Sequence, residues 1–304
     1  MRVGVAATPW VALPTLDWLF ASEHELALVI TQPDRPAGRG QAVRESAVGQ
    51  WAHAHQVPIC KPESSDELLQ KLDGLDLVIT IGYGVILPMS VLSIPKFGFI
   101  NLHFSLLPAW RGAAPVVRAV LNGDVISGIT VFKLDAGMDT GPVYVSHEMS
   151  IGAHENAGEL LERMAVVGPQ VISKTLELLA GAVAPIPQLT TGVSYAAKIR
   201  KEDARIDWHR GVDVLDRHIR AFTPEPGAWT LWRDQPLRVS KAHLANFEVR
   251  LQPGEISMVD GSLLVGCGSN EAMMIERLTP AGKREMTATQ WFNGARVLAG
   301  DHFV

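Results

Sequence analysis

The chain has 304 residues, of which 47% are hydrophobic and 19% are charged. This length favours about two domains, and the hydrophobic fraction excludes a largely disordered chain. The formal net charge of -5 excludes a strongly basic protein that binds nucleic acid through overall charge alone.

The first half of the sequence alternates short apolar runs with helical patterns. Apolar runs typical of buried strands lie at residues 3–7, 26–31, 57–60, 77–81, 99–102 and 129–134. Helical spacing of apolar residues appears between them, at residues 11–20, 48–55, 65–72 and 115–121. Strands that alternate with helices predict an α/β fold with a mostly parallel sheet covered by helices on both faces.

A long helical pattern over residues 153–180 follows, with Gly181 as its stop. Residues 183–188 contain two prolines, and the polar stretch after them is typical of a linker. We therefore predict a catalytic domain at residues 1–188, a linker at 189–208 and a C-terminal domain at 209–304.

The C-terminal part changes to short alternating runs separated by turns. These runs lie at residues 229–232, 237–242, 254–259, 262–265 and 272–278, and a final helix is expected at 288–298. Many short strands with regular turns predict a small antiparallel barrel or sandwich.

Several common kinds of site are not expected. Gly4 has no further glycines at dinucleotide-binding spacing, and the chain carries no Walker-type phosphate loop. Cys60 and Cys267 lie far apart without close Cys or His partners at metal spacing, so we expect no disulfide and no metal. Residues 1–8 lack the features of a secretory signal, and no apolar stretch is long enough to cross a bilayer. We expect a cytoplasmic protein.

Two polar residues stand at the end of an otherwise apolar strand. Asn101 and His103 are two positions apart, which puts both side chains on one face of an extended backbone. The carboxyl ends of parallel strands form the ligand crevice of an open sheet. The pair is therefore a candidate for catalysis. The alternative is that His103 is a hydrogen-bonded structural histidine.

A glycine-rich turn over residues 134–142 carries two carboxylates, Asp135 and Asp139. A carboxylate near a histidine can hold its tautomer, raise its pKa or relay protons through water. The alternative is a plain turn in which aspartate serves as a turn former.

These motifs resemble the signature of the formyltetrahydrofolate-dependent formyltransferase family. The resemblance lies in Asn101-Leu102-His103, in the Ser-Leu-Leu-Pro loop after it, and in Asp139 within Gly-Met-Asp-Thr-Gly. Residues 32–40 and 198–208 further resemble an inserted loop and a C-terminal region of those members that formylate methionyl initiator tRNA. Phe104 departs from the family, which commonly has a small residue there.

The resemblance implies a Rossmann-like formyltransferase domain followed by a small OB-like β-barrel domain that binds tRNA. It also implies that the formyl group passes from 10-formyltetrahydrofolate to the α-amine of charged initiator methionyl-tRNA, without a metal or a covalent enzyme intermediate. Asn101 and His103 would donate to the negative oxygen of the intermediate, and Asp139 would relay a proton through water and tune His103.

Further site residues follow from the same resemblance. The folate co-substrate is expected to contact three segments near the catalytic residues: Ser105, Leu106, Leu107 and Pro108; Tyr83, Gly84 and Val85; and Leu134, Asp135, Ala136 and Gly137. The tRNA is expected to contact Arg39, Lys198, Arg200 and Lys201. We expect a monomer that does not bind membranes.

Two other functions remain open at this point. A formyltransferase acting on a small amine, such as an amino sugar nucleotide or glycinamide ribonucleotide, would share Asn101, His103 and Asp139. It should lack the Arg39 loop and need not have a barrel domain. A non-catalytic nucleic-acid-binding protein would have no reason to keep the three polar residues together.

Overall fold

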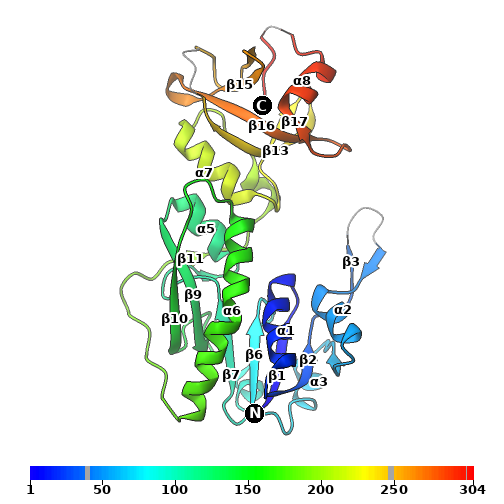
Figure 1. Cartoon of the computed structure of the whole chain (residues 1–304), viewed down its shortest axis with the longest axis vertical. Helices are drawn as coiled ribbons and strands as arrows, with labels where there is room; N and C mark the ends of the chain where they lie inside the picture. Colours follow the sequence, from blue (N-terminus) through cyan, green and yellow to red (C-terminus); the bar gives the residue numbers. More distant parts are fainter. Residues whose placement is uncertain (38–41, 246–249, 299) are drawn as a thin grey trace. The chain divides into compact units, whose positions relative to one another are not determined.

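The computed structural model describes residues 1–37, 42–245, 250–298 and 300–304 (Figure 1). The chain forms two compact units. The first unit contains Met1–Pro115, Ile126–Ser150 and Leu161–Ala197, and the second contains Val116–Val125, Ile151–Leu160 and Lys198–Val304. No helix among the described residues is both long and apolar enough to cross a membrane.

A seven-stranded sheet forms the centre of the first unit, in the order β10-β9-β7-β6-β1-β2-β5. The five strands from β7 to β5 are parallel, whereas β9 runs antiparallel to β7 and β10 antiparallel to β9. The strand bounds are β1 Arg2–Ala7, β2 Glu25–Ile30, β5 Ile59–Cys60, β6 Leu77–Ile81, β7 Phe99–His103, β9 Ile126–Lys133 and β10 Val143–Ser150. The predicted α/β fold with a mostly parallel sheet is confirmed.

Helices cover both faces of this sheet. The packing of Gly168 against Leu102 and Thr15 places α6 and α1 on one face, and α3 and α4 pack with Phe99 and Val78 on the other. The bounds are α1 Leu13–Ala21, α2 Ala47–Ala54, α3 Ser65–Leu69, α4 Met89–Leu92 and α6 Ala157–Ala180, with a 3₁₀ turn η1 at Trp10–Ala12. Two short two-stranded pairs join β3 Arg35–Ala37 with β4 Ala42–Arg44, and β8 Arg111–Gly112 with β11 Tyr195–Ala196.

The structure places the start of α6 later than the predicted position 153. The side chain of Asn156 accepts a hydrogen bond from the backbone N–H of Glu159, and the Glu159 carboxylate accepts one from the N–H of Asn156. This reciprocal pair satisfies two donors that a helix start leaves unpaired. The helix therefore begins at Ala157, after the cap.

The second unit is built around a curled antiparallel sheet, in the order β12-β13-β16-β15-β14, with β17 paired to β16 (Figure 1). The bounds are β12 Trp229–Trp232, β13 Gln235–Leu244, β14 Ile256–Val259, β15 Ser262–Gly266, β16 Ala272–Pro280 and β17 Met286–Thr287. Register shifts along β13 bend the sheet. This half-barrel confirms the predicted small β domain of OB-like type.

Helices complete the second unit. They are α5 Pro115–Asn122, α7 Val212–Phe222 and α8 Ala288–Ala295, with 3₁₀ turns η2 at Lys201–Ala204 and η3 at Gly268–Asn270. Helix α7 was not predicted, although Leu215, Ile219 and Phe222 are buried at helical spacing. The core gathers these residues with Trp208, whose indole N–H donates to the hydroxyl of Thr230 at 3.0 Å.

Candidate active site

Strand β7 carries Asn101 and His103 in the middle of the large sheet, between β6 and β9. In register, Asn101 lies beside Thr80 of β6, and His103 lies beside Thr130 of β9. Because successive side chains alternate between faces, both residues project from the face that also carries Phe99. His103 is 6% exposed, so its ring is held by the protein rather than by solvent.

The amide of Asn101 is held by Thr80. The Thr80 hydroxyl donates to Asn101 Oδ1 at 2.7 Å, and Thr80 itself is only 4% exposed. The same hydroxyl lies 3.1 Å from the carbonyl oxygen of Ile100, but the shorter separation is the one typical of an O–H···O bond. Since Oδ1 faces Thr80, the amide NH₂ of Asn101 points away from Thr80 and can donate to another group.

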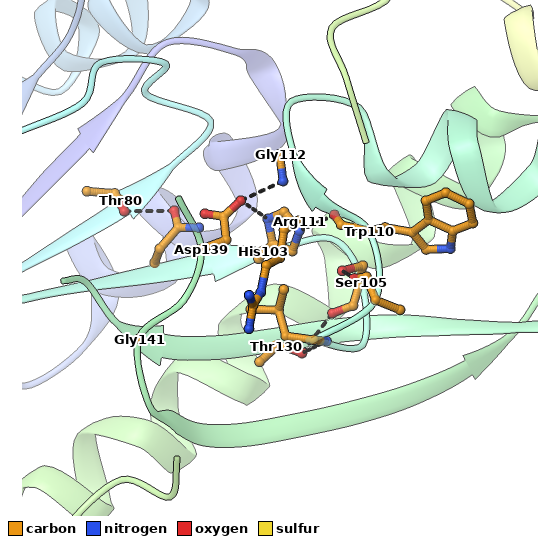
Figure 2. Close-up of polar contacts among 12 residues, drawn as sticks. Thr80, His103, Ser105, Trp110, Arg111, Gly112, Thr130, Asp139 and Gly141 are labelled. Carbon is orange, nitrogen blue, oxygen red and sulfur yellow. Dashed lines mark hydrogen bonds and ion pairs between the residues drawn. The ribbon is translucent and has the colours of Figure 1, made fainter. Parts of the chain in front are cut away.

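The two ring nitrogens of His103 have different neighbours (Figure 2). Nε2 lies 3.0 Å from the carbonyl oxygen of Trp110, which can only accept, so Nε2 carries a proton. Nδ1 faces Asp139 Oδ2 at 3.8 Å. Burial lowers the pKa of His103, while the charge of Asp139 and the Trp110 carbonyl oppose this shift. A ring with its Nε2 proton fixed can donate from Nδ1 only in the protonated, imidazolium form.

Asp139 lies in the turn between β9 and β10, with its side chain directed at His103 and at the loop after β7 (Figure 2). The backbone N–H of Gly112 donates to Asp139 Oδ2 at 2.7 Å. The side chain is 16% exposed, so its charge is only partly screened by water. The structure therefore brings the three predicted catalytic residues together, from a strand and from a turn almost forty positions later.

Small residues make this arrangement possible. Gly112 has a φ of 119°, and a Cβ there would lie 2.7 Å from the carbonyl oxygen of Ala196. A Cβ on Gly141 would lie 1.8 Å from the carbonyl oxygen of Lys133. Both positions thus require glycine if the loop after β7 and the β9–β10 turn are to lie close to His103.

The loop after His103 is stabilised by its own polar groups. The Ser105 hydroxyl donates to the carbonyl of Ala109 at 2.6 Å, and the Thr130 hydroxyl donates to the carbonyl of Ser105 at 2.7 Å. Ser105 is fully buried, and Leu106, Leu107 and Pro108 are partly exposed. The Ser105 side chain therefore shapes the loop, whereas the three residues after it offer surface.

The other predicted co-substrate residues occupy two places. Tyr83 and Val85 line a cavity of about 550 Å³ with residues from the ends of β2 and β5, and the Tyr83 carbonyl accepts from the side chain of Gln32 at 2.7 Å. Gly84 lies between them and is exposed. In the turn after β9, Asp135 accepts from the N–H of Gly137 at 3.0 Å. Leu134 and Asp135 are half-buried, and Ala136 and Gly137 are exposed.

The basic residues predicted to meet a nucleic acid lie elsewhere. Arg39 falls outside the described residues. Lys198, Arg200 and Lys201 are exposed in the second unit. The Lys201 ammonium lies 5.8 Å from the ring centre of Trp229, and Arg200 forms a 3.3 Å ion pair with Asp203.

Two features of the described part of the chain bear on metal binding and on thiol chemistry. No group of three or more His, Cys, Asp or Glu side chains there could hold a metal ion. Burial raises the pKa of the Cys267 thiol to about 12, which leaves it protonated and a poor nucleophile.

Comparison with known proteins relates both units to one family. The family model described as "Formyl transferase" matches residues 7–176, and "Formyl transferase, C-terminal domain" matches residues 198–296. The chain is 41% identical to a methionyl-tRNA formyltransferase of Salinispora tropica over 99% of both chains. It is 43% identical to one from Rhodococcus erythropolis over 98% of both chains.

Solved structures show the same fold at lower identity. HypX from Aquifex aeolicus in complex with tetrahydrofolic acid has a TM-score of 0.69 and 16% identity, covering 96% of this chain. This chain spans about half of HypX, 47% of its length. The sugar 3N-formyl transferase WlaRD has a TM-score of 0.68 and 19% identity, covering 93% of this chain and 99% of that one.

Proposed function

The chain belongs to the formyl transferase family, and on that premise we propose that it formylates the α-amino group of methionyl initiator tRNA. The formyl donor is 10-formyltetrahydrofolate, and the product is N-formylmethionyl-tRNA for translation initiation. The observation that carries this function is the match of about 40% identity to methionyl-tRNA formyltransferases over both units of the chain.

The reaction forms one carbon–nitrogen bond and breaks another. The amine lone pair attacks the formyl carbon, the carbonyl oxygen becomes negative, and collapse of the intermediate releases the folate nitrogen. Asn101, with its amide NH₂ turned away from Thr80, donates to this oxygen. Protonated His103 donates from Nδ1. Donors aimed at a developing oxyanion stabilise the transition state more than the ground state.

One proton has to move from the attacking nitrogen to the departing one. The Asp139 carboxylate, close to Nδ1 of His103, accepts the proton through a water and returns it to the leaving nitrogen. The same charge partly offsets burial, which still holds the pKa of His103 below its ordinary value, so the imidazolium that donates from Nδ1 is favoured toward lower pH. Asp139 thus has two tasks, and the Gly112 N–H holds its oxygen for both.

The folate co-substrate is placed beside this centre. Leu106, Leu107 and Pro108 give it apolar surface, and backbone groups of residues 83–85 and 134–137 meet the polar edges of the pterin. Arg39, Lys198, Arg200 and Lys201 contact the tRNA, with phosphates as the main partners. The protein acts as a monomer in the cytoplasm.

A comparison of acceptors tests the function. Purified protein is incubated with labelled 10-formyltetrahydrofolate and methionyl initiator tRNA, methionyl elongator tRNA, an amino sugar nucleotide or glycinamide ribonucleotide. We expect transfer to the initiator tRNA at a kcat/KM well above that for the other acceptors. If only a small amine is formylated, that amine rather than the tRNA is the acceptor.

Thr80→Val is expected to lower kcat about 5- to 10-fold, with little change in KM. Valine has the shape of threonine but lacks the hydroxyl that orients the Asn101 amide, and one hydrogen bond is worth about 1 kcal/mol. Steady-state kinetics with saturating tRNA measure the effect. Thr175→Val is the matched control, since the buried Thr175 hydroxyl donates to the Val171 carbonyl within its own helix. Equal kcat losses in both variants would argue against a role for Thr80 in orientation.

Replacing Lys198, Arg200 and Lys201 together by Gln is expected to raise KM for the tRNA and leave kcat nearly unchanged. Each phosphate contact adds about one unit to the slope of log affinity against log salt concentration. The slope of the triple variant should therefore be smaller by about two to three units. The slope is measured from KM between low and moderate salt. Lys174→Gln, at an exposed position of α6, is the control. An unchanged slope in the triple variant would mean that these residues do not contact tRNA phosphates.

A further inference from the structure

We propose that Gln188 is a positioning residue that holds the Asp139 turn, and through it the carboxylate that faces His103. The inference rests on the proposed function, because it concerns the same site. Gln188 lies 49 positions after Asp139 and has no chemistry of its own to offer the reaction.

The side chain of Gln188 uses all of its hydrogen-bonding capacity between the two catalytic loops. Nε2 donates to the carbonyl oxygens of Asp139 and Gly141, both at 2.8 Å. Oε1 accepts from Nη2 of Arg111 at 2.6 Å and from its Nε at 3.2 Å. Because a guanidinium can only donate, it fixes which end of the amide is the oxygen. The amide NH₂ is thereby directed at the turn.

The backbone brings Gln188 to this position. Ile186 and Val143 exchange two backbone hydrogen bonds, of 2.7 and 2.8 Å, as an antiparallel pair at the start of β10. In an antiparallel register, the residue two positions after Ile186 lies opposite the residue two positions before Val143. Gln188 therefore stands opposite Gly141, where its side chain can reach the carbonyls of the turn.

Such support favours the turn because Asp139 has a left-handed backbone conformation. Asp139 has a φ of 54°, a left-handed conformation that a side chain disfavours. Interactions from outside the turn add to its internal hydrogen bonds at Asp135 and help to hold this conformation. The Gln188 amide supplies one such interaction from the carbonyl side, and the Gly112 N–H supplies another from the carboxylate side.

The same stretch of chain also holds the facing loop. Arg111–Gly112 pairs in parallel with Tyr195–Ala196, and the N–H of Trp110 donates to the Ser194 hydroxyl at 2.9 Å. Residues 186–196 thus hold the loop with Trp110, whose carbonyl lies against His103, and they also hold the turn that carries Asp139. The Gln188 side chain bonds to both, through Arg111 and through the Asp139 carbonyl.

Two substitutions separate the contacts of Gln188. Gln188→Ala removes all of them, whereas Gln188→Glu keeps acceptors for Arg111 but loses the donors to the turn. We expect both to lower kcat about 10- to 100-fold, the range for a small misplacement of a catalytic group, with KM for tRNA changed less than 3-fold. Gln50→Ala, which removes one exposed amide bond to the Glu45 carbonyl, is the matched control. Wild-type kcat in Gln188→Glu would overturn the proposal.

A second measurement does not depend on the acceptor. The imidazole of His103 is titrated by NMR in the wild type, Gln188→Ala, Asp139→Asn and the double variant. If Gln188 acts through Asp139, Gln188→Ala lowers the pKa of His103 in the same direction as Asp139→Asn and adds no further shift in the double variant. An unchanged His103 titration in folded Gln188→Ala would contradict the proposal even if the tRNA assignment holds. The predicted shift without tRNA formylation would contradict only the proposed function.

Discussion

Asp139→Asn is expected to lower kcat about 100- to 10,000-fold, the usual range for loss of a general acid–base group, while the protein stays folded. Asparagine keeps the shape and can still accept from the Gly112 N–H. It cannot carry a proton between the two nitrogens, and it no longer supplies the negative charge 3.8 Å from His103. Both tasks of Asp139 are therefore lost while the turn is kept.

The pH dependence distinguishes the two losses. Asp139 raises the pKa of His103 against burial, so its removal lets that pKa fall further below the ordinary value. The imidazolium form, which donates from Nδ1, is lost on the alkaline side of the His103 pKa. The alkaline limb of kcat should therefore move to lower pH in Asp139→Asn.

Pre-steady-state formyl transfer from pH 5 to 9 makes this measurement, with Asp73→Asn as an exposed control. A variant that keeps wild-type kcat would remove Asp139 from the mechanism. A slower variant with an unmoved alkaline limb would leave Asp139 as a proton relay that does not tune His103.

The catalytic strand could be predicted because its chemistry is local. Asn101 and His103 are two positions apart on one strand, and strand periodicity alone puts them on one face. The sequence marked Asp135 and Asp139 as candidates, but only the family resemblance selected Asp139, since its approach to His103 depends on how the β9–β10 turn folds back on Gly112. The distance of 3.8 Å is a property of the tertiary structure.

The supporting residues gave no comparable signal. Thr80 is one hydroxyl in an apolar strand, and its role exists because β6 and β7 pair in the register that sets it beside Asn101. Gln188 follows a proline-rich stretch and becomes relevant only through the bridge between Ile186 and Val143. A sequence pattern covers neighbours along the chain, whereas these contacts join segments more than twenty positions apart.

Element ends differ from the prediction where side chains, rather than periodicity, decide them. The long helix starts at Ala157 because Asn156 and Glu159 form its cap. The strand predicted at 57–60 is limited to Ile59–Cys60. The Pro58 carbonyl still accepts from the Val29 N–H at 2.8 Å, but proline has no N–H to donate, so the ladder on both sides of the backbone starts at Ile59. The alternation of strands and helices in the first half, which depends on apolar periodicity, was predicted, but β10 and α7 were missed.

Asn101→Ala is expected to lower kcat about 100- to 1000-fold, the cost of removing one oxyanion donor. The side chain is held by Thr80 with its NH₂ available for the reacting oxygen, so its loss affects the transition state more than binding. KM for both substrates should change little. Asn101→Asp should be at least as slow, because it has the same shape but places a negative charge where a donor is needed.

The link between Asn101 and Thr80 makes this prediction sharper. If Thr80 acts only by orienting the Asn101 amide, Thr80→Val should cost nothing further once Asn101 is Ala. A double-mutant cycle on kcat measures the coupling, with Thr175→Val in place of Thr80→Val as the reference cycle. Additive losses in the first cycle would mean that Thr80 supports the site by another route. A small effect of Asn101→Ala alone would mean that Asn101 is not an important donor to the oxyanion and that His103 acts with other donors.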